Sequence, residues 1–246
     1  MTAVIVVPCY NEGVRWNAEY WAEATALPGV EWIFVDDGST DDTRTLIGQV
    51  ASAGAAAQLL LERNAGKAEA VRHGLLRALE GAPSAVGFMD ADGAFDAQDV
   101  RDLLAMFEAR TTPAGGFDAI WSSRVALAGR DIRRSARRHY IGRVVASFVS
   151  LGQEEIPYDT QSGLKLFVPS DTLAACLATP FETRWMFELE MLSRWQGTKG
   201  SEMRIWEEPL NYWHDVPGSK ITVRESARIL RELAVIKRAQ RRARRS

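Results

Sequence analysis

The chain has 246 residues, of which 46% are hydrophobic and 25% charged, a composition typical of one globular domain with a sizeable core. No apolar stretch approaches the roughly 18 residues that a membrane-spanning helix needs, and the start of the chain lacks the charged segment of a signal peptide. Two cysteines, Cys9 and Cys176, form neither a disulfide framework nor a metal-ligand spacing, so we expect a reducing, cytoplasmic compartment.

Four apolar runs predict buried strands, and a helical pattern follows each of them. The runs cover residues 4–7, 32–35, 59–61 and 88–89, and the helical patterns cover residues 14–26, 41–53, 67–79 and 96–109. Strands that alternate with helices of this length indicate right-handed βαβ units. We therefore predict an α/β fold, with a Rossmann-like, mostly parallel sheet flanked by helices.

Each predicted strand ends in polar residues that are capable of chemistry: Glu12, Asp37, Lys67, and the pair Asp90 and Asp92. In open α/β sheets, ligands bind at the edge formed by the carboxyl ends of the strands. Asp90 and Asp92 are spaced i, i+2, so their carboxylates share one face of an extended chain. Mg²⁺ is held by one or two carboxylates together with substrate phosphates. The sequence therefore predicts a metal site at this pair, and a solvated acidic turn is the alternative.

The net charge of −2 conceals two basic segments. Residues 130–143 hold six basic side chains against one acidic, and residues 224–246 hold nine against two, so these segments carry +12 and the remainder −14. Both interleave basic with apolar residues at helical spacing, which is typical of surfaces that bind anionic lipid headgroups. Solvated helix faces are the alternative. Nucleic acid is not expected, because the remainder is acidic and no nucleic-acid motif is present. The apolar residues of the second segment are Ile229, Leu230, Leu233, Val235 and Ile236.

Ordered motifs occupy most of the chain. In the first half they are PCYNE (8–12), VDDGSTD (35–41), NAGK (64–67) and DADGA (90–94). This series resembles the inverting family 2 glycosyltransferases, which have the GT-A fold. In the second half they are SSR (122–124), DTQSGLKLF (159–167), RWMFELE (184–190) and PGSK (217–220). These are similar to the polyprenyl-phosphate sugar transferases, nearest to the dolichyl-phosphate β-glucosyltransferases and then to the mannosyltransferases. The resemblance covers residues 3–223.

The resemblance implies that Pro8, Tyr10, Glu12, Val35 and Asp37 hold the nucleoside of the sugar donor. A carboxylate suits this task, because ribose hydroxyls and base N–H groups are hydrogen-bond donors. Two alternatives stay open at these positions. Asp37 could cap a turn before the next helix, and Pro8 and Tyr10 could serve turn formation and packing.

The resemblance also implies that Asp90 and Asp92 coordinate Mg²⁺ or Mn²⁺ on the donor's diphosphate, with Ala91 against the donor. Such an ion neutralises the leaving nucleoside diphosphate and replaces a protonating side chain. Lys67, at a predicted helix start, would face phosphate, although a plain exposed lysine is the alternative. Ala94 stands where the mannosyl branch has a polar residue, which favours the glucosyl branch.

The implied acceptor is a lipid monophosphate. Its oxygen is largely ionised near neutral pH, with a second pKa of about 6, so no strong general base is obligatory. Positioning and relief of phosphate–phosphate repulsion are required instead. Arginine forks match phosphate oxygens, and solvated basic side chains are the alternative. The candidates for this task are Arg124, Arg134, Arg137, Arg138 and Lys220.

Asp159 and Gln161 precede a short strand predicted at residues 162–168, and we expect them to line the sugar subsite. Gly163 would allow the backbone to approach the ligand closely. A polar loop that enters a strand is the alternative. Glu188, on a helix with Trp185, is the candidate for a base or a sugar contact, and the rival interpretation is an ion pair on the helix surface. Trp185 is expected to pack in the core or shape the acceptor channel.

The sequence thus predicts a GT-A domain at residues 1–223, with a nucleotide-binding half at 1–110 and an acceptor and sugar half at 111–223. A basic amphipathic C-terminal helix is expected at 224–246. The predicted reaction transfers a hexose, from UDP-glucose first and GDP-mannose second, to a polyprenyl phosphate at the cytoplasmic face of a membrane. A family 2 enzyme with a soluble hydroxyl acceptor and a non-catalytic nucleotide-sugar scaffold are the alternatives. No subunit interface is identified.

Overall fold

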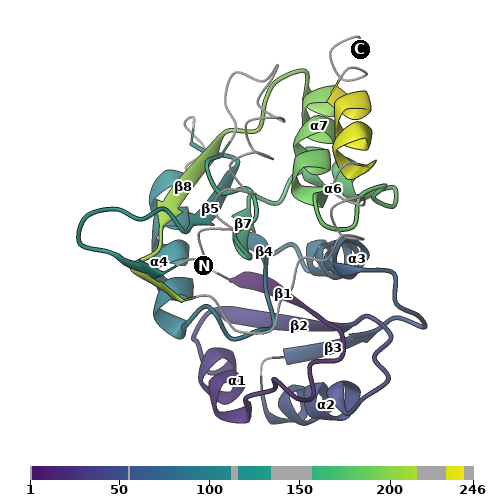
Figure 1. Ribbon diagram of the computed structural model, residues 1–246, viewed down its shortest axis with the longest axis vertical. Helices are drawn as coiled ribbons and strands as arrows, with labels where there is room; N and C mark the ends of the chain where they lie inside the picture. Colours follow the sequence, from purple (N-terminus) through teal and green to yellow (C-terminus); the bar gives the residue numbers. More distant parts are fainter. Residues whose placement is uncertain (1, 55, 112–115, 134–156, 215–230, 241–246) are drawn as a thin grey trace.

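The computed structural model describes residues 2–54, 56–111, 116–133, 157–214 and 231–240 (Figure 1). Its centre is a seven-stranded sheet with the order β3-β2-β1-β4-β7-β5-β8, beside a two-stranded sheet of β6 and β9. The strand bounds are β1 Ala3–Cys9, β2 Val30–Asp36, β3 Ala56–Leu60, β4 Ala85–Met89, β5 Ala119–Ser123, β6 Asp131–Arg133, β7 Leu164–Phe167, β8 Ile205–Pro209 and β9 Tyr212–His214.

All strands of the large sheet except β7 share one direction. β1 pairs in parallel with β2 and β4, β2 with β3, and β5 with β8, whereas β7 is antiparallel to both β4 and β5. The predicted mostly parallel α/β sheet is confirmed. Because β7 runs the other way, the residues that precede it, rather than those that follow it, lie at the carboxyl edge of the sheet. The amide of Asp90 donates to the carbonyl of Gly163 at 2.9 Å across this edge.

The helices lie near their predicted positions. Their bounds are α1 Ala18–Thr25, α2 Thr43–Ala53, α3 Lys67–Leu79, α4 Ala97–Arg110, α6 Asp171–Leu177 and α7 Phe187–Lys199, and residues 231–240 are also helical. α3 matches its prediction. α1 begins later than predicted, because the Asn17 side chain accepts a hydrogen bond from the Tyr20 amide and so caps the helix at that point. Asp96 caps α4 in the same way, through the amides of Gln98 and Asp99.

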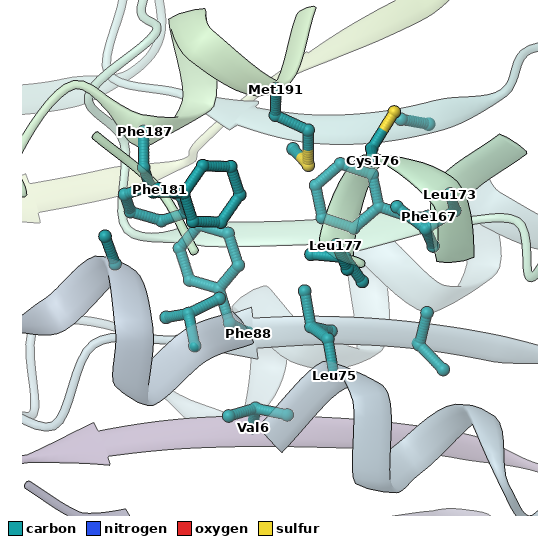
Figure 2. Packing of buried hydrophobic residues seen from close by; sticks show 14 of the residues in the cluster. Val6, Leu75, Phe88, Phe167, Leu173, Cys176, Leu177, Phe181, Phe187 and Met191 are labelled. Carbon is teal, nitrogen blue, oxygen red and sulfur yellow. The ribbon is translucent and has the colours of Figure 1, made fainter. Parts of the chain in front are cut away.

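Each face of the large sheet has its own apolar core. Successive β1 residues alternate between the two, since Val4 and Val6 belong to one cluster and Ile5 and Val7 to the other. The first cluster joins the sheet to α3, α6 and α7, and Figure 2 shows Val6, Leu75 of α3, Phe88 of β4 and Phe187 of α7 within it. The second cluster joins the opposite face to α1, α2 and α4. Burial on both faces explains why the strands read as continuous apolar runs.

The helix at residues 231–240 lies beside α7 (Figure 1) and completes the first cluster. Leu233 and Ile236 belong to that cluster and are buried. The Glu232 carboxylate accepts hydrogen bonds of 3.0–3.1 Å from the amides of residues 184–186, just before α7. The expectation that Leu233 and Ile236 form a lipid-binding face is therefore wrong, because the core already covers them.

Within the part of the chain that the structure describes, no helix is long and apolar enough to cross a membrane. The expected acceptor residues Arg134, Arg137, Arg138 and Lys220 lie outside the described residues.

Candidate active site

The loops that follow β1 and β2 are joined to each other by hydrogen bonds. The Asn11 side chain accepts from the Thr40 amide at 2.9 Å, and the Asn11 amide donates to the Ser39 hydroxyl at 3.0 Å. The Glu12 amide donates to the Thr43 hydroxyl at 2.7 Å. Asn11 has a φ of 52°, a left-handed conformation that asparagine tolerates better than most residues. The two loops therefore form one polar ledge at the carboxyl edge of the sheet.

Asp37 fixes a third loop to this ledge. Its two carboxylate oxygens accept from the amides of Ala65 and Gly66, each at 2.7 Å. Burial raises the pKa of Asp37, and the two amide bonds oppose that shift. The alternative role as a turn cap belongs instead to Asp36, whose side chain accepts from the Ser39 amide at 3.0 Å. Asp37 thus orients the backbone that leads into α3, and a nucleoside contact from it stays a prediction.

The other expected nucleoside residues have mixed positions. Tyr10 is 43% exposed and Pro8 is partly exposed, so both are accessible at the edge of the sheet. Glu12 is buried, and its carboxylate forms an ion pair of 2.7 Å with Arg15. The Val35 side chain is fully buried in the core, so it is not exposed at the ledge, and a nucleoside contact from this residue stays a prediction.

Lys67 and Asp90 form an ion pair of 2.5 Å where α3 meets β4. Burial lowers the pKa of Lys67, but the neighbouring carboxylates of Asp90 and Glu188 outweigh this effect and raise it. Gly66 adopts a φ of 99° as the residue before the helix, which glycine tolerates without strain. The resemblance implied that Lys67 faces phosphate. Its ion pair with Asp90 was not predicted from the sequence.

Asp92 follows on the same turn, beside the partly buried Ala91. Its carboxylate accepts from the Ala94 amide at 3.2 Å. Burial and, next, the charge of Asp90 raise the pKa of Asp92. A cation stabilises two neighbouring carboxylates that are partly shielded from water. This pair of oxygen ligands therefore fits a hard divalent ion that takes its remaining ligands from phosphate. No group of three or more potential metal ligands occurs among the described residues.

Gly163 lies directly against the carboxylate of Asp90. A Cβ atom at this position would overlap the Asp90 carboxyl group, so only glycine fits without movement. The predicted close approach at Gly163 is therefore made to an acidic side chain of the site. The strand that begins one residue later, β7, brings this contact about because it runs antiparallel to β4.

Arg124 and Asp159, which were predicted separately, form one bidentate pair. The guanidinium donates to both oxygens of Asp159 at 2.7 and 2.8 Å, and the Arg124 amide donates to the same carboxylate at 2.9 Å. The Trp213 ring lies 5.1 Å from the guanidinium carbon. The amides of Tyr158 and Asp159 donate to Glu207 of β8 at 2.6 and 2.9 Å. Asp159 thus orients Arg124. No sequence pattern pointed to Glu207.

Glu188 is buried in the first turn of α7, where it faces Lys165 of β7 at 3.5 Å. Burial raises the pKa of Glu188 and lowers that of Lys165, and each charge opposes the shift of the other. The second oxygen of Glu188 is buried without a hydrogen-bond partner among the described residues. The rival interpretation as an ion pair is correct in its chemistry, although the pair lies in the interior and not on the helix surface.

Gln161 and Trp185 complete the expected residues. Gln161 is partly buried, and its amide nitrogen has no hydrogen-bond partner in the described part of the chain. Trp185 is 54% exposed and precedes α7, so the expectation that it packs in the core is wrong. The neighbouring Arg184, which the sequence did not single out, donates to the Asn64 side chain at 3.0 Å and reaches the loop before α3.

The sequence profile described as glycosyl transferase family 2 matches residues 4–151, and these include the ledge, Lys67, Asp90 and Asp92. The chain belongs to glycosyltransferase family 2. No curated protein matches the sequence at a significant level.

Solved structures agree with this family assignment at the level of the fold. Glucosyl-3-phosphoglycerate synthase from Mycobacterium tuberculosis, in complex with Mn²⁺, UDP and phosphoglyceric acid, is similar with a TM-score of 0.64 and 19% identity, over 97% of this chain and 78% of that one. TarS 1–349 from S. aureus, in complex with UDP, has a TM-score of 0.56 and 19% identity, over 96% of this chain. This chain covers 65% of the TarS chain. The expected GT-A fold is confirmed.

Proposed function

We propose that this family 2 glycosyltransferase transfers a hexose from a nucleoside-diphosphate sugar to a polyprenyl phosphate at a membrane surface, with inversion. Glucose from UDP-glucose is the favoured donor sugar, and mannose from GDP-mannose is the second. The reaction is metal-dependent, and the enzyme acts as a peripheral protein at the cytoplasmic face. The nucleoside would lie on the ledge near Tyr10 and Asp37, with its diphosphate toward Asp90 and Asp92.

The chemistry of the donor side supports a divalent ion. Asp90 and Asp92 would hold Mg²⁺ or Mn²⁺, and the similar synthase from M. tuberculosis is known with Mn²⁺ and UDP. The ion, when bound, supplies charge neutralisation at the leaving diphosphate. Lys67 adds a cation within 2.5 Å of Asp90, which limits the excess of negative charge before a donor arrives.

The observation that carries the acceptor assignment is that the candidate base Glu188 and the sugar-subsite candidate Asp159 are both engaged in ion pairs. Asp159 gives both oxygens to the Arg124 fork, and Glu188 is buried against Lys165. A hydroxyl acceptor needs a base that takes up its proton. An ionised phosphate monoester needs none, since its oxygen is already a nucleophile. Such an acceptor would attack the anomeric carbon in line with the departing diphosphate, with Arg124 beside it as a positioning cation.

The experiment is a transfer assay with the purified protein, Mg²⁺ or Mn²⁺, a panel of nucleotide sugars, and short polyprenyl phosphates in anionic liposomes. The lipid-linked sugar is read by mass spectrometry. We expect transfer from one donor that stops with EDTA and in Asp92→Ala. Slow hydrolysis of the nucleotide sugar without lipid product would overturn the acceptor assignment but would still support the proposed donor site.

Membrane association is tested separately by sedimentation with vesicles. The basic segments at residues 130–143 and 224–246 predict binding that requires anionic lipid and weakens as salt rises. Equal sedimentation with neutral and anionic vesicles would contradict it.

A second candidate is transfer to a soluble acceptor. It is favoured by the similar synthase in complex with phosphoglyceric acid, and by the burial of Leu233 and Ile236, which removes an apolar surface expected to meet lipid. Product with phosphorylated small molecules, and no lipid requirement, would support it. A non-catalytic nucleotide-sugar scaffold would show UDP binding by calorimetry but no turnover. Turnover would then be absent from both the wild type and Asp92→Ala.

A further inference from the structure

Lys165 is a charged residue on β7, an inner strand of the large sheet. Its side chain is 0% exposed, and its β7 neighbours are apolar and buried. The ammonium lies 4.7 Å from the ring centroid of Trp121 and 5.3 Å from that of Phe88, the aromatic residue of β4 labelled in Figure 2. A lysine away from water is unfavourable unless its donors are satisfied, and lysine is rarely found fully buried. The donor and acceptor assignments above give Lys165 no task.

The ammonium of Lys165 satisfies its three donors within the loop that precedes β7 and on α7. It donates to the carbonyl of Thr160 at 3.1 Å and makes a short hydrogen bond to the carbonyl of Ser162. Its third partner is the Glu188 carboxylate at 3.5 Å. The three N–H donors of the ammonium therefore each have an acceptor. Lys165 thereby links two backbone carbonyls of the loop to α7.

That same loop carries the contacts to both sides of the site. Asp159, one residue before Thr160, clamps Arg124 with both oxygens. Gly163, one residue after Ser162, lies against the Asp90 carboxylate, and its carbonyl accepts from the Asp90 amide at 2.9 Å. The position of the loop therefore sets the separation between the metal-binding carboxylates and Arg124.

We propose that Lys165 is a positioning residue of the transfer reaction, which fixes residues 159–163 and through them aligns Asp90 with Arg124. This inference rests on the proposed function, because it assigns the two aligned groups to the donor diphosphate and to the acceptor phosphate. Methionine would fill the same volume and avoid the burial of a charge. A role in packing alone would not require an ammonium.

The test compares Lys165→Met with the double variant Lys165→Met/Glu188→Gln. The single variant leaves Glu188 as an unpaired buried charge, whereas the double variant removes both charges. Neutral replacement of a whole buried ion pair is often tolerated, so the double variant is expected to unfold cooperatively near the wild-type temperature. Its kcat nonetheless stays about 100-fold below that of the wild type, because a displacement near 1 Å at the reacting groups has such an effect. Its affinity for Mn²⁺ with UDP, measured by calorimetry, falls about tenfold.

Two further variants serve as references. Glu188→Gln alone keeps the ammonium on both carbonyls, so its kcat falls less than about tenfold. Lys199→Met removes a lysine that also faces a carboxylate, Asp118 at 3.1 Å, and an aromatic ring, Trp195 at 5.2 Å, at the far end of α7. Its kcat stays within about twofold of the wild type.

Recovery of wild-type kcat and Mn²⁺ affinity in the double variant would overturn the proposal, since activity would then follow stability alone. A Glu188→Gln variant as inactive as the double variant would also overturn it and assign the role to Glu188. If the double variant does not fold, Gly163→Ala supplies the second arm. It leaves Lys165 in place and displaces the loop from Asp90, so the same loss of Mn²⁺ affinity is expected, and unchanged affinity would refute the link.

Failure of the proposed function is distinguishable from failure of this inference. A wild type that transfers no sugar to any acceptor removes the proposed reaction. The calorimetric affinities for Mn²⁺ and UDP still decide whether Lys165 sets the geometry of Asp90.

Discussion

At the ends of β1 and β2, backbone amides and short polar side chains join neighbouring loops, whereas beside β5 and β7 the site is joined by pairs of buried charges. Asn11 and Asp37 each accept from main-chain amides of another loop. Arg124 and Asp159 instead pair through their side chains, with 13% and 4% of the side-chain surface exposed.

The two regions should respond differently to substitution. A typical hydrogen bond contributes about 1 kcal/mol net, so a network of many such bonds loses little when one is removed. Breaking a buried ion pair by removal of one partner is unfavourable by about 3–5 kcal/mol, because the other charge is left without compensation. The loops at the ends of β1 and β2 are therefore held by many distributed hydrogen bonds, and the region beside β5 and β7 by a few buried ion pairs.

The largest expected effect is on turnover, after substitution of Asp92. Asp92→Asn keeps an oxygen for the Ala94 amide but removes the charge that would bind the metal. We expect kcat to fall about 1000-fold, or about 4 kcal/mol in the barrier, with a free energy of unfolding within about 1 kcal/mol of the wild type. Steady-state kinetics and urea unfolding measure the two quantities. Asp102→Asn, on the surface of α4, is the matched control, and equal losses in both variants would contradict the metal site.

The next effect is on stability beside β5 and β7. Arg124→Met leaves Asp159 buried without its fork, so the free energy of unfolding should fall by about 3 kcal/mol in urea titrations. Arg133→Met removes an exposed pair with Asp131 and should leave the unfolding midpoint unchanged. Similar midpoints for the two variants would show that the region beside β5 and β7 is not held by a few strong ion pairs.

A smaller loss is expected on the ledge. Asn11→Ala removes the hydrogen bond to the Thr40 amide and places alanine at a φ of 52°, so we expect about 2 kcal/mol of destabilisation. Asn11→Gly loses the hydrogen bond but accepts the backbone conformation, so its loss should be about half as large. Thermal or urea unfolding separates the two. A loss as large as that in Arg124→Met would remove the contrast between the two regions.

The smallest effect is a pH dependence away from both regions. Burial raises the pKa of Asp99 to about 6, above its unfolded value of about 3.9. A raised carboxyl pKa means that the folded state favours the neutral acid. The stability that protonated Asp99 contributes is therefore fully present below pH 4 and is lost as pH rises through 6. Asp99→Asn should therefore match the wild type near pH 4 and exceed it by about 1 kcal/mol at pH 8. Urea unfolding at the two pH values measures this, and a gain that is equal at both would contradict the assignment.

The sequence alone predicted the parallel part of the sheet and most of its helices well. The apolar runs at residues 4–7 and 32–35 lie within β1 and β2, and the prediction for residues 67–79 matches α3. These signals are local, because burial on both faces and helical periodicity depend on neighbouring residues. Asp90 and Asp92 were placed at the edge on the same grounds.

Interactions between distant segments were beyond the reach of sequence patterns. Arg124 and Asp159 are 35 residues apart, and Lys165 and Glu188 are 23 apart, so no periodicity joins them. No local sequence pattern indicated that β7 is antiparallel to β4, although this direction brings Gly163 to Asp90. The basic apolar pattern at residues 224–246 indicated a lipid surface, whereas Leu233 and Ile236 face the core. An amphipathic pattern reveals that a face is covered, but not by what.

The contact between Glu232 and residues 184–186 has a consequence for synthesis of the chain. α7 has no side-chain cap of its own, and this late carboxylate lies at its N-terminal end, where negative charge is favourable. A chain emerging from the ribosome presents β1 to β4 long before residue 232. The ledge should therefore form first, and the turn that carries Glu188 should settle last, once residue 232 has been made and can contact it.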